Sequence, residues 1–267
     1  GACEAAREAV VHRRCAVTGR PSTRGASIHE ASSPDITPPG RARLDTPSES
    51  TRTFAMGDAV PGVLNPGTRL VLLGSLIVGW FLLIQRFGDG DVYAVLGPYA
   101  CVVCSISWTL YPRAMRHWLQ PSWRAIWVGF AVGTGMTALT YPVFQLAVHV
   151  APSLDGEVQT LYTGARSTTL AKALAWLIAL ALAEELLFRG AWPATLRNYM
   201  SAPAAFTVSL LSYALAQLGT GSWIVMALAS VCGALWTLQR RYTGSLLSPL
   251  IAHLIWSPTL ILLYPVT

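Results

Sequence analysis

Long apolar runs constrain the fold of this chain more than any other feature. From Arg69 onward there are seven of them, over about residues 70–85, 92–111, 125–150, 170–192, 203–218, 222–238 and 245–264. A helix of about 20 apolar residues spans a hydrocarbon core of about 30 Å, and these runs reach or nearly reach that length. The sequence therefore predicts an all-α, polytopic membrane bundle of about seven transmembrane helices within residues 68–267.

The charge content excludes an ordinary soluble domain. Only 12% of the 267 residues are charged, whereas about 25% is usual in soluble proteins. The net charge of +6 comes mostly from arginines scattered at the ends of apolar runs. That distribution fits orientation in a membrane better than a phosphate-binding patch. We therefore expect contact with the lipid bilayer and no nucleic-acid partner.

The N-terminal segment has a different composition. Residues 1–67 are rich in Gly, Pro, Ser, Thr and Arg and show no apolar periodicity. Such a segment cannot bury enough apolar surface to offset the entropy that it loses on ordering. We expect these residues to form a disordered arm. The first methionine, Met56, stands shortly before the first apolar run, and we expect native translation to start there.

Basic residues gather after every second apolar run, whereas the loops after the first, third and fifth runs hold at most one arginine each, together with Asp89, Asp91, Asp155 and Glu157. The basic residues are Arg113, Arg116 and Arg124 after the second run, Arg189 and Arg197 after the fourth, and Arg240 and Arg241 after the sixth. Because cytoplasmic loops carry the excess of Lys and Arg, the pattern predicts a cytoplasmic N-terminus and an external C-terminus.

Two adjacent carboxylates, Glu184 and Glu185, lie within the fourth run. An acidic side chain near the centre of a spanning helix costs roughly 2.5–3.5 kcal/mol, so such residues usually face a cavity or a partner. Arg189 follows Glu185 by four residues, the favourable order for an ion pair. Glu184, rotated by about 100°, faces in a different direction. The alternative is that these three charges only mark a helix end at the headgroup boundary.

Two further polar pairs lie in apolar runs, Tyr213 with Gln217 and His253 with Ser257. Each pair is spaced by four residues and therefore projects from one helix face. Glu184 and Gln217 are nearly equidistant from a turn near residues 200–201, which predicts that they meet at one depth of a helical hairpin. Glu184, Gln217 and His253 then line one buried cavity. Taken singly, Gln217 and His253 could also be ordinary interhelical hydrogen-bonding groups.

These motifs resemble the CPBP family of intramembrane glutamate proteases, which includes CAAX proteases and bacteriocin-processing enzymes. The resemblance rests on Glu-Glu-x-x-x-Arg-Gly at 184–190, an aromatic-x-x-x-polar pair at 213–217 and His-x-x-x-Ser at 253–257, and it covers about residues 165–264. It implies an endopeptidase in a bacterial inner membrane that hydrolyses a peptide bond of a membrane-anchored or membrane-delivered protein, with no cofactor and no metal. Residues 140–162 are also similar to bacterial members linked to C-terminal sorting signals, the myxosortase-like group.

The resemblance also implies roles for individual residues. Glu184 is the base that activates water, Glu185 with Arg189 is an orienting pair, and His253 supports the oxyanion. Gln217 stands where the family has His, and Ser257 stands where it has Asn or Asp. Because Gln cannot take up a proton, either Glu184 works as the sole base or the chain has lost proteolysis and only binds its target.

A transporter or channel that uses Glu184 as a proton or cation site is the third hypothesis. Transporters of this kind usually show paired halves or broken helices at corresponding positions. The sequence has no such internal pairing, so we rank this hypothesis below the other two.

Overall fold

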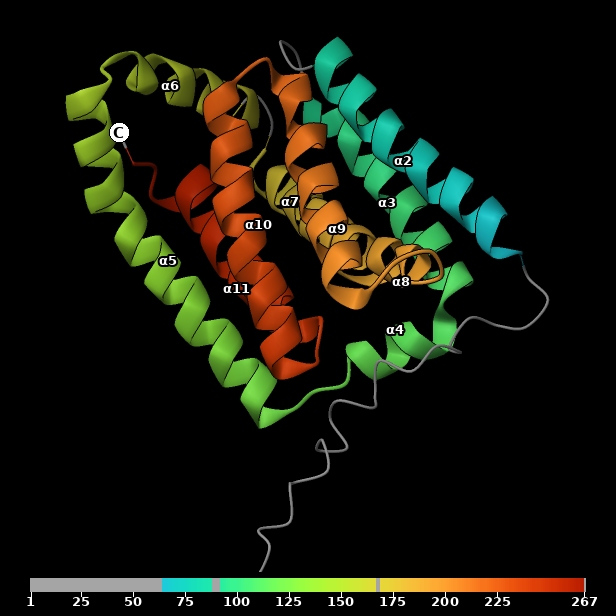
Figure 1. Ribbon diagram of the computed structural model, residues 1–267. Coiled ribbons are helices and arrows are strands. Elements are labelled where there is room, and N and C mark those ends of the chain that lie inside the picture. The colour runs from blue at the N-terminus through green and yellow to red at the C-terminus, as the bar shows by residue number, and fades with distance from the viewer. Residues whose placement is uncertain (1–63, 88–91, 167–168, 267) are drawn as a thin grey trace, which may run out of the picture. The chain divides into compact units, whose positions relative to one another are not determined.

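Helices account for all seven apolar runs in the computed structural model, which describes residues 64–87, 92–166 and 169–266. The corresponding helices are α2 (Pro66–Phe87), α3 (Val92–Leu110), α5 (Trp123–Val150), α7 (Leu170–Glu184), α9 (Ala202–Ala216), α10 (Trp223–Thr243) and α11 (Leu247–Pro258) (Figure 1). No strand occurs in these ranges, and the predicted all-α fold is confirmed. Residues 1–63, including Met56, lie outside the described residues.

Shorter helical segments extend or connect these helices. They are α4 (Pro112–Trp118), α6 (Ser153–Arg166), α8 (Trp192–Leu196), the π-helices η1 (Glu185–Ala191) and η3 (Thr259–Leu263), and the 3₁₀-helix η2 (Gln217–Thr220). In Figure 1, α4 and α6 lie at opposite ends of the bundle. Helix starts follow local sequence signals, since the hydroxyl of Ser122 accepts a hydrogen bond from Ala125 N at the start of α5. Helix α10 ends at Gly244, whose φ of 71° suits glycine.

The number of membrane crossings follows from the length and apolarity of these helices. Among the described residues, α2, α5, α9 with η2, and α10 are each long and apolar enough to span a membrane. Helices α3 and α4 would form a fifth span, bent by 105°. Helix α11 with η3 is shorter. The chain is thus an integral membrane bundle, while the count of seven spans stays a prediction.

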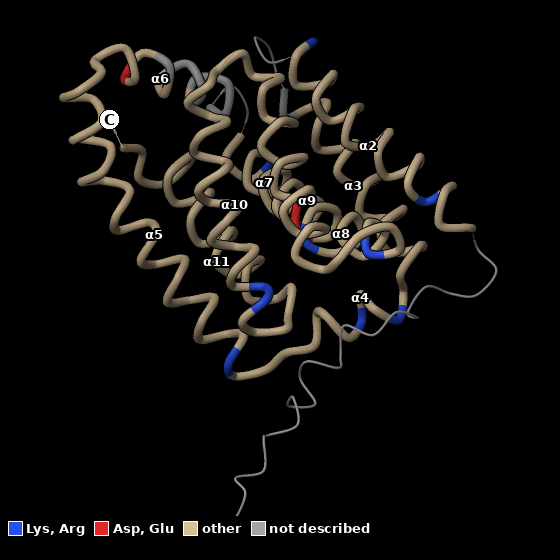
Figure 2. The backbone as a smooth tube through the Cα atoms, viewed as in Figure 1, with Lys and Arg blue, Asp and Glu red and all other residues tan. Residues whose placement is uncertain are grey.

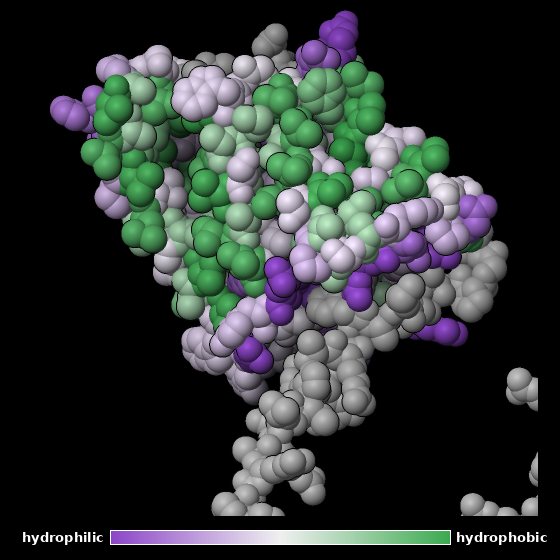
Figure 3. All heavy atoms as spheres, in the orientation of Figure 1, coloured by the Kyte–Doolittle hydropathy of each residue, from purple (hydrophilic) through white to green (hydrophobic). Residues whose placement is uncertain are grey.

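The outer surface of the bundle is apolar in its middle and basic toward one end. Large apolar side chains are exposed on several helices, such as Leu82 on α2, Phe130 on α5, Leu215 on α9 and Val231 on α10. Figure 3 shows this apolar surface over α5, α9 and α10. In Figure 2, most of the Lys and Arg residues lie toward the end of the bundle that holds α4 and α8. A broad exposed apolar surface is what a lipid-facing bundle requires.

Helices α5 and α11 approach each other closely through glycines. A Cβ on Gly129 would lie 2.7 Å from Ser248 O, and one on Gly133 would lie 2.8 Å from Ala252 Cα. Small residues allow helices to pack at short distance within a membrane. Because Ala252 directly precedes His253, this contact fixes where α11 presents the imidazole.

Candidate active site

The fourth apolar run changes its helix type where its charges begin. Helix α7 ends at Glu184 and continues as the π-helix η1, in which Trp192 N donates to Leu187 O. Pro193 follows in the first turn of α8, where a residue without an N–H is tolerated. In a regular α-helix, its ring would clash with the carbonyl of Arg189. The wider π turn lets the helix continue past Pro193, and π turns are frequent at functional sites.

The predicted ion pair between Glu185 and Arg189 is present. Arg189 Nη1 donates to Glu185 Oε1 at 3.3 Å, and both side chains are 1% exposed. The same carboxylate oxygen lies 3.1 Å from His253 Nδ1. An ionised carboxylate only accepts hydrogen bonds, so Nδ1 carries the proton in this contact. Glu185 thereby fixes the orientation of the imidazole.

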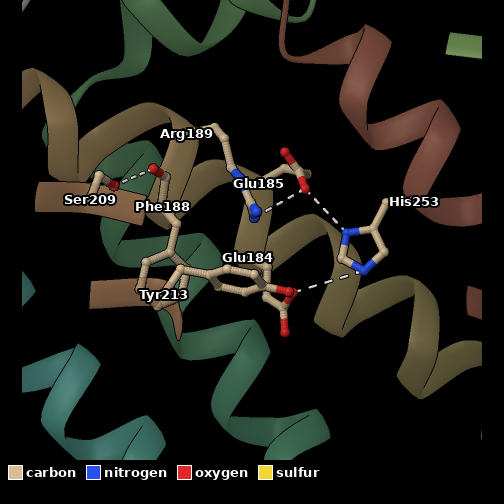
Figure 4. A network of polar contacts seen from close by, with 7 residues as sticks. All are labelled: Glu184, Glu185, Phe188, Arg189, Ser209, Tyr213 and His253. Carbon is tan, nitrogen blue, oxygen red and sulfur yellow. Dashed lines mark hydrogen bonds and ion pairs between the residues drawn. The ribbon is translucent and has the colours of Figure 1, made fainter. Parts of the chain in front are cut away.

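Glu184 lies on the other side of the same imidazole. Its Oε2 accepts a hydrogen bond from the Tyr213 hydroxyl at 2.8 Å and is 3.8 Å from His253 Nε2. Figure 4 shows the imidazole beside both carboxylates, with one nitrogen toward each. The two glutamates do point in different directions, as neighbouring positions on a helix require. A single ring with two nitrogens nevertheless reaches both of them.

Aromatic rings surround these charges. The indole of Trp236 stacks on the imidazole of His253, with ring centroids 4.0 Å apart and an interplanar angle of 20°. The Arg189 guanidinium lies 4.2 Å from the centre of the Tyr213 ring and 5.3 Å from that of Trp236. Such contacts stabilise a cation that is shielded from water. Aromatic packing therefore holds both His253 and Arg189 in place.

Little of the cluster is exposed. Glu184, Glu185, Arg189 and His253 are each between 1% and 9% exposed. With His253 protonated, two positive charges balance two negative ones, which reduces the cost of burying the group. A carboxylate in such surroundings can act as a base toward water near neutral pH. The arrangement is therefore able to perform general base chemistry within the bundle.

Comparison with known families identifies this part of the chain. Residues 166–258 match the family model described as type II CAAX prenyl endopeptidase Rce1-like. This segment is similar to Rce1-like domains. The match is consistent with the CPBP resemblance and indicates a membrane endopeptidase with a peptide substrate. No curated protein and no solved structure matches the chain.

The matched segment contains all the side chains of the buried cluster. Residues 140–162, on which the myxosortase-like resemblance rests, lie outside the matched segment, and that subtype stays a prediction. Among the described residues, no group of three His, Cys, Asp or Glu side chains is arranged to hold a metal ion.

Two of the six predicted site residues, Gln217 and Ser257, do not join the buried cluster. Gln217 is half-buried at the end of α9, and its side chain makes no hydrogen bond to a described residue. Ser257 is buried one turn beyond His253, and its hydroxyl likewise bonds to none of the described site residues. The residue that meets Glu184 is Tyr213, one turn before Gln217. The π-helix η1 and the non-helical residues 197–201 lie between Glu184 and α9, so counting residues at a constant rise from the turn does not identify the partner of Glu184.

Some polar atoms of the site lack a protein partner. Glu185 Oε2 and Arg189 Nη2 are buried and make no hydrogen bond within the described residues. A small cavity with room for about one water molecule lies beside Arg189 and is also lined by Trp118, Arg197 and Arg240. Buried polar atoms usually bind another group or an ordered water. The cavity borders Arg189 but not Glu184, Glu185 or His253, so it lies next to the cluster and not between its carboxylates.

Proposed function

We propose that the chain is an intramembrane endopeptidase of the glutamate type, acting on a membrane-anchored or membrane-delivered protein. The observation that carries this proposal is the buried cluster in which one imidazole lies between Glu184 and the Glu185–Arg189 pair. The Rce1-like match over residues 166–258 supports it.

Glu184 is the general base in this proposal. Its carboxylate takes a proton from a water molecule, and the resulting hydroxide adds to the carbonyl carbon of the scissile peptide bond. The C–N bond then breaks, and the leaving nitrogen receives the proton held by Glu184. A positioned base of this kind typically contributes about 10²–10⁴ to the rate.

His253 supports the oxyanion. Because Glu185 holds its Nδ1–H, an Nε2–H donor requires the imidazolium form, whose charge together with Arg189 balances the two carboxylates. This Nε2–H can donate to the negative oxygen that forms on the scissile carbonyl. Donors fixed before the reaction stabilise that charge without reorganisation. Glu185 and Arg189 act here through His253, by orienting its ring.

A specific observation supports a second candidate function, a binding protein with the architecture of a protease. The side chain of Gln217, which stands at the family's His position, makes no hydrogen bond within the described residues. If an imidazole at that position is indispensable, the chain binds a peptide segment without cutting it.

One experiment separates the two functions. Membrane-anchored candidate proteins are co-expressed with the wild type, with Glu184→Gln, or with Arg116→Met, a control variant at an exposed position on α4. Cleavage of each candidate and its co-purification with the protein are both measured. The protease predicts cleavage by the wild type and the control, and none by Glu184→Gln. A candidate that co-purifies equally with all three and stays intact would contradict proteolysis and favour the binding protein.

A further inference from the structure

The two oxygens of Glu184 have different hydrogen-bond partners among the described residues. Oε2 accepts the hydrogen bond of the Tyr213 hydroxyl at 2.8 Å and faces His253 Nε2 at 3.8 Å. Oε1 accepts no hydrogen bond from any described residue, and the Glu184 side chain keeps 12% of its surface exposed. The two oxygens therefore have different surroundings, and Oε1, which is not fully buried, keeps its acceptor sites for water.

Tyr213 itself has little freedom to move. The residue is 5% exposed, its ring meets that of Phe188 edge-on at 5.1 Å, and the Arg189 guanidinium lies 4.2 Å from its ring centre. Phe188 is anchored in turn, since its carbonyl oxygen accepts a hydrogen bond from the Ser209 hydroxyl of α9. The Tyr213 hydroxyl is thus delivered to Glu184 at a fixed point.

A carboxylate held at one oxygen has a defined rotation. The terminal torsion of a glutamate side chain is broad, so a free carboxylate would present either oxygen in many directions. A hydrogen bond from a neutral donor to an ionised acceptor is stronger than one between neutral groups. The bond from Tyr213 to Oε2 therefore restricts the rotation of the carboxylate and leaves Oε1 as the oxygen without a hydrogen bond to a described residue.

We propose that Tyr213 is a positioning residue for Glu184. Its hydroxyl holds Oε2, so that Oε1 takes the proton from the hydrolytic water. This role rests on the proposed function of Glu184 as the base. It also supplies a polar group beside Glu184 in a chain whose Gln217 makes no hydrogen bond to the cluster.

The kinetic test is Tyr213→Phe, which removes one hydroxyl and keeps the ring against Phe188 and Arg189. Tyr111→Phe is a matched control. The buried Tyr111 hydroxyl is 2.6 Å from Thr195 Oγ1, with which it forms a hydrogen bond, and it does not contact Glu184. The lost hydrogen bond has a charged acceptor, and hydrogen bonds of this kind are stronger than those between neutral groups. We therefore expect Tyr213→Phe to lower kcat by about 10- to 100-fold with little change in KM. We expect Tyr111→Phe to keep its kcat. Equal kcat values for the two variants, or a loss that falls on KM alone, would overturn the proposal.

A spectroscopic test does not depend on cleavage. The infrared bands of Glu184 are those that Glu184→Gln removes from the spectrum of the purified protein. Tyr213→Phe should shift these bands, and Tyr111→Phe should leave them unchanged. Bands that stay in place in Tyr213→Phe would overturn the proposal even if the wild type cleaves. A shift in a protein that cleaves nothing would support the contact while the proposed function fails. If Tyr213→Phe does not fold, a fluorinated tyrosine at position 213 changes the donor with little change in shape, and the same shift is expected.

Discussion

Replacing Arg189 by methionine should destabilise the bundle because it leaves Glu185 charged without its main partner. Both side chains of this pair are 1% exposed, so water cannot take the place of the guanidinium. Removing one partner of a buried ion pair typically costs about 3–5 kcal/mol, which corresponds to a factor of about 10²–10⁴ in the ratio of folded to unfolded protein. His253 Nδ1 lies 3.1 Å from Glu185 and still contacts its carboxylate in the variant. This contact offsets part of the free-energy cost, so we expect a loss of stability in the lower half of the range of about 3–5 kcal/mol. Methionine keeps most of the side-chain volume.

The double variant Glu185→Gln with Arg189→Met isolates the electrostatic part of the effect. It also loses the contacts of the guanidinium with Tyr213 and Trp236, so these losses cancel when the two variants are compared. Unfolding of the purified proteins in detergent gives the comparison, with the exposed Arg116→Met of α4 as the control. We expect the double variant to recover most of the stability that Arg189→Met loses. If Arg189→Met is as stable as the double variant, the pairing of Glu185 with Arg189 does not stabilise the bundle.

Three further outcomes follow from the same contacts. Gln217→Ala should change kcat by less than about threefold, because the Gln217 side chain makes no hydrogen bond to the cluster. A larger loss of kcat in a cleavage assay would show that Gln217 enters the site when substrate binds. Gly133→Ala should lower the free energy of unfolding by about 1–3 kcal/mol, because the new Cβ would lie 2.8 Å from Ala252 Cα. Gly135→Ala on the same helix should not lower it, because no atom lies within 4 Å of the new Cβ. Equal unfolding curves for the two variants would contradict the close packing of α5 on α11. Reporter fusions after Arg116 and after Arg241 should both report the cytoplasm, and an external signal from either would overturn the proposed orientation.

Much of the site could be predicted from sequence because its signals are local. Acidic residues are rare in apolar runs, so Glu184 and Glu185 stand out without any knowledge of the fold. The spacing of four residues predicts the pair between Glu185 and Arg189, and the structure contains it. His253 stands out for the same reason as the glutamates, as a titratable residue in an apolar helix.

The parts that could not be predicted depend on tertiary structure. Tyr213 rather than Gln217 meets Glu184 in a hairpin whose first arm contains the π-helix η1, and the sequence contains only Pro193 as a signal of that irregularity. Trp236 stacks on His253 because α10 packs beside α11, yet a tryptophan in an apolar helix usually indicates only a lipid-facing or core position. The residues that position the proposed catalytic groups are thus harder to find in the sequence than those groups themselves.

The rate of the purified enzyme with and without the Glu184 carboxylate tests the central claim most directly. The measurement compares kcat of the wild type, Glu184→Gln and Glu185→Gln on one membrane-anchored substrate in lipid vesicles. If Glu184 is the base, Glu184→Gln lowers kcat by at least about 10²-fold, and Glu185→Gln, which still accepts the His253 hydrogen bond, lowers it less. A Glu184→Gln enzyme that cleaves as fast as the wild type, or faster than Glu185→Gln, would contradict the assignment of Glu184 as the base.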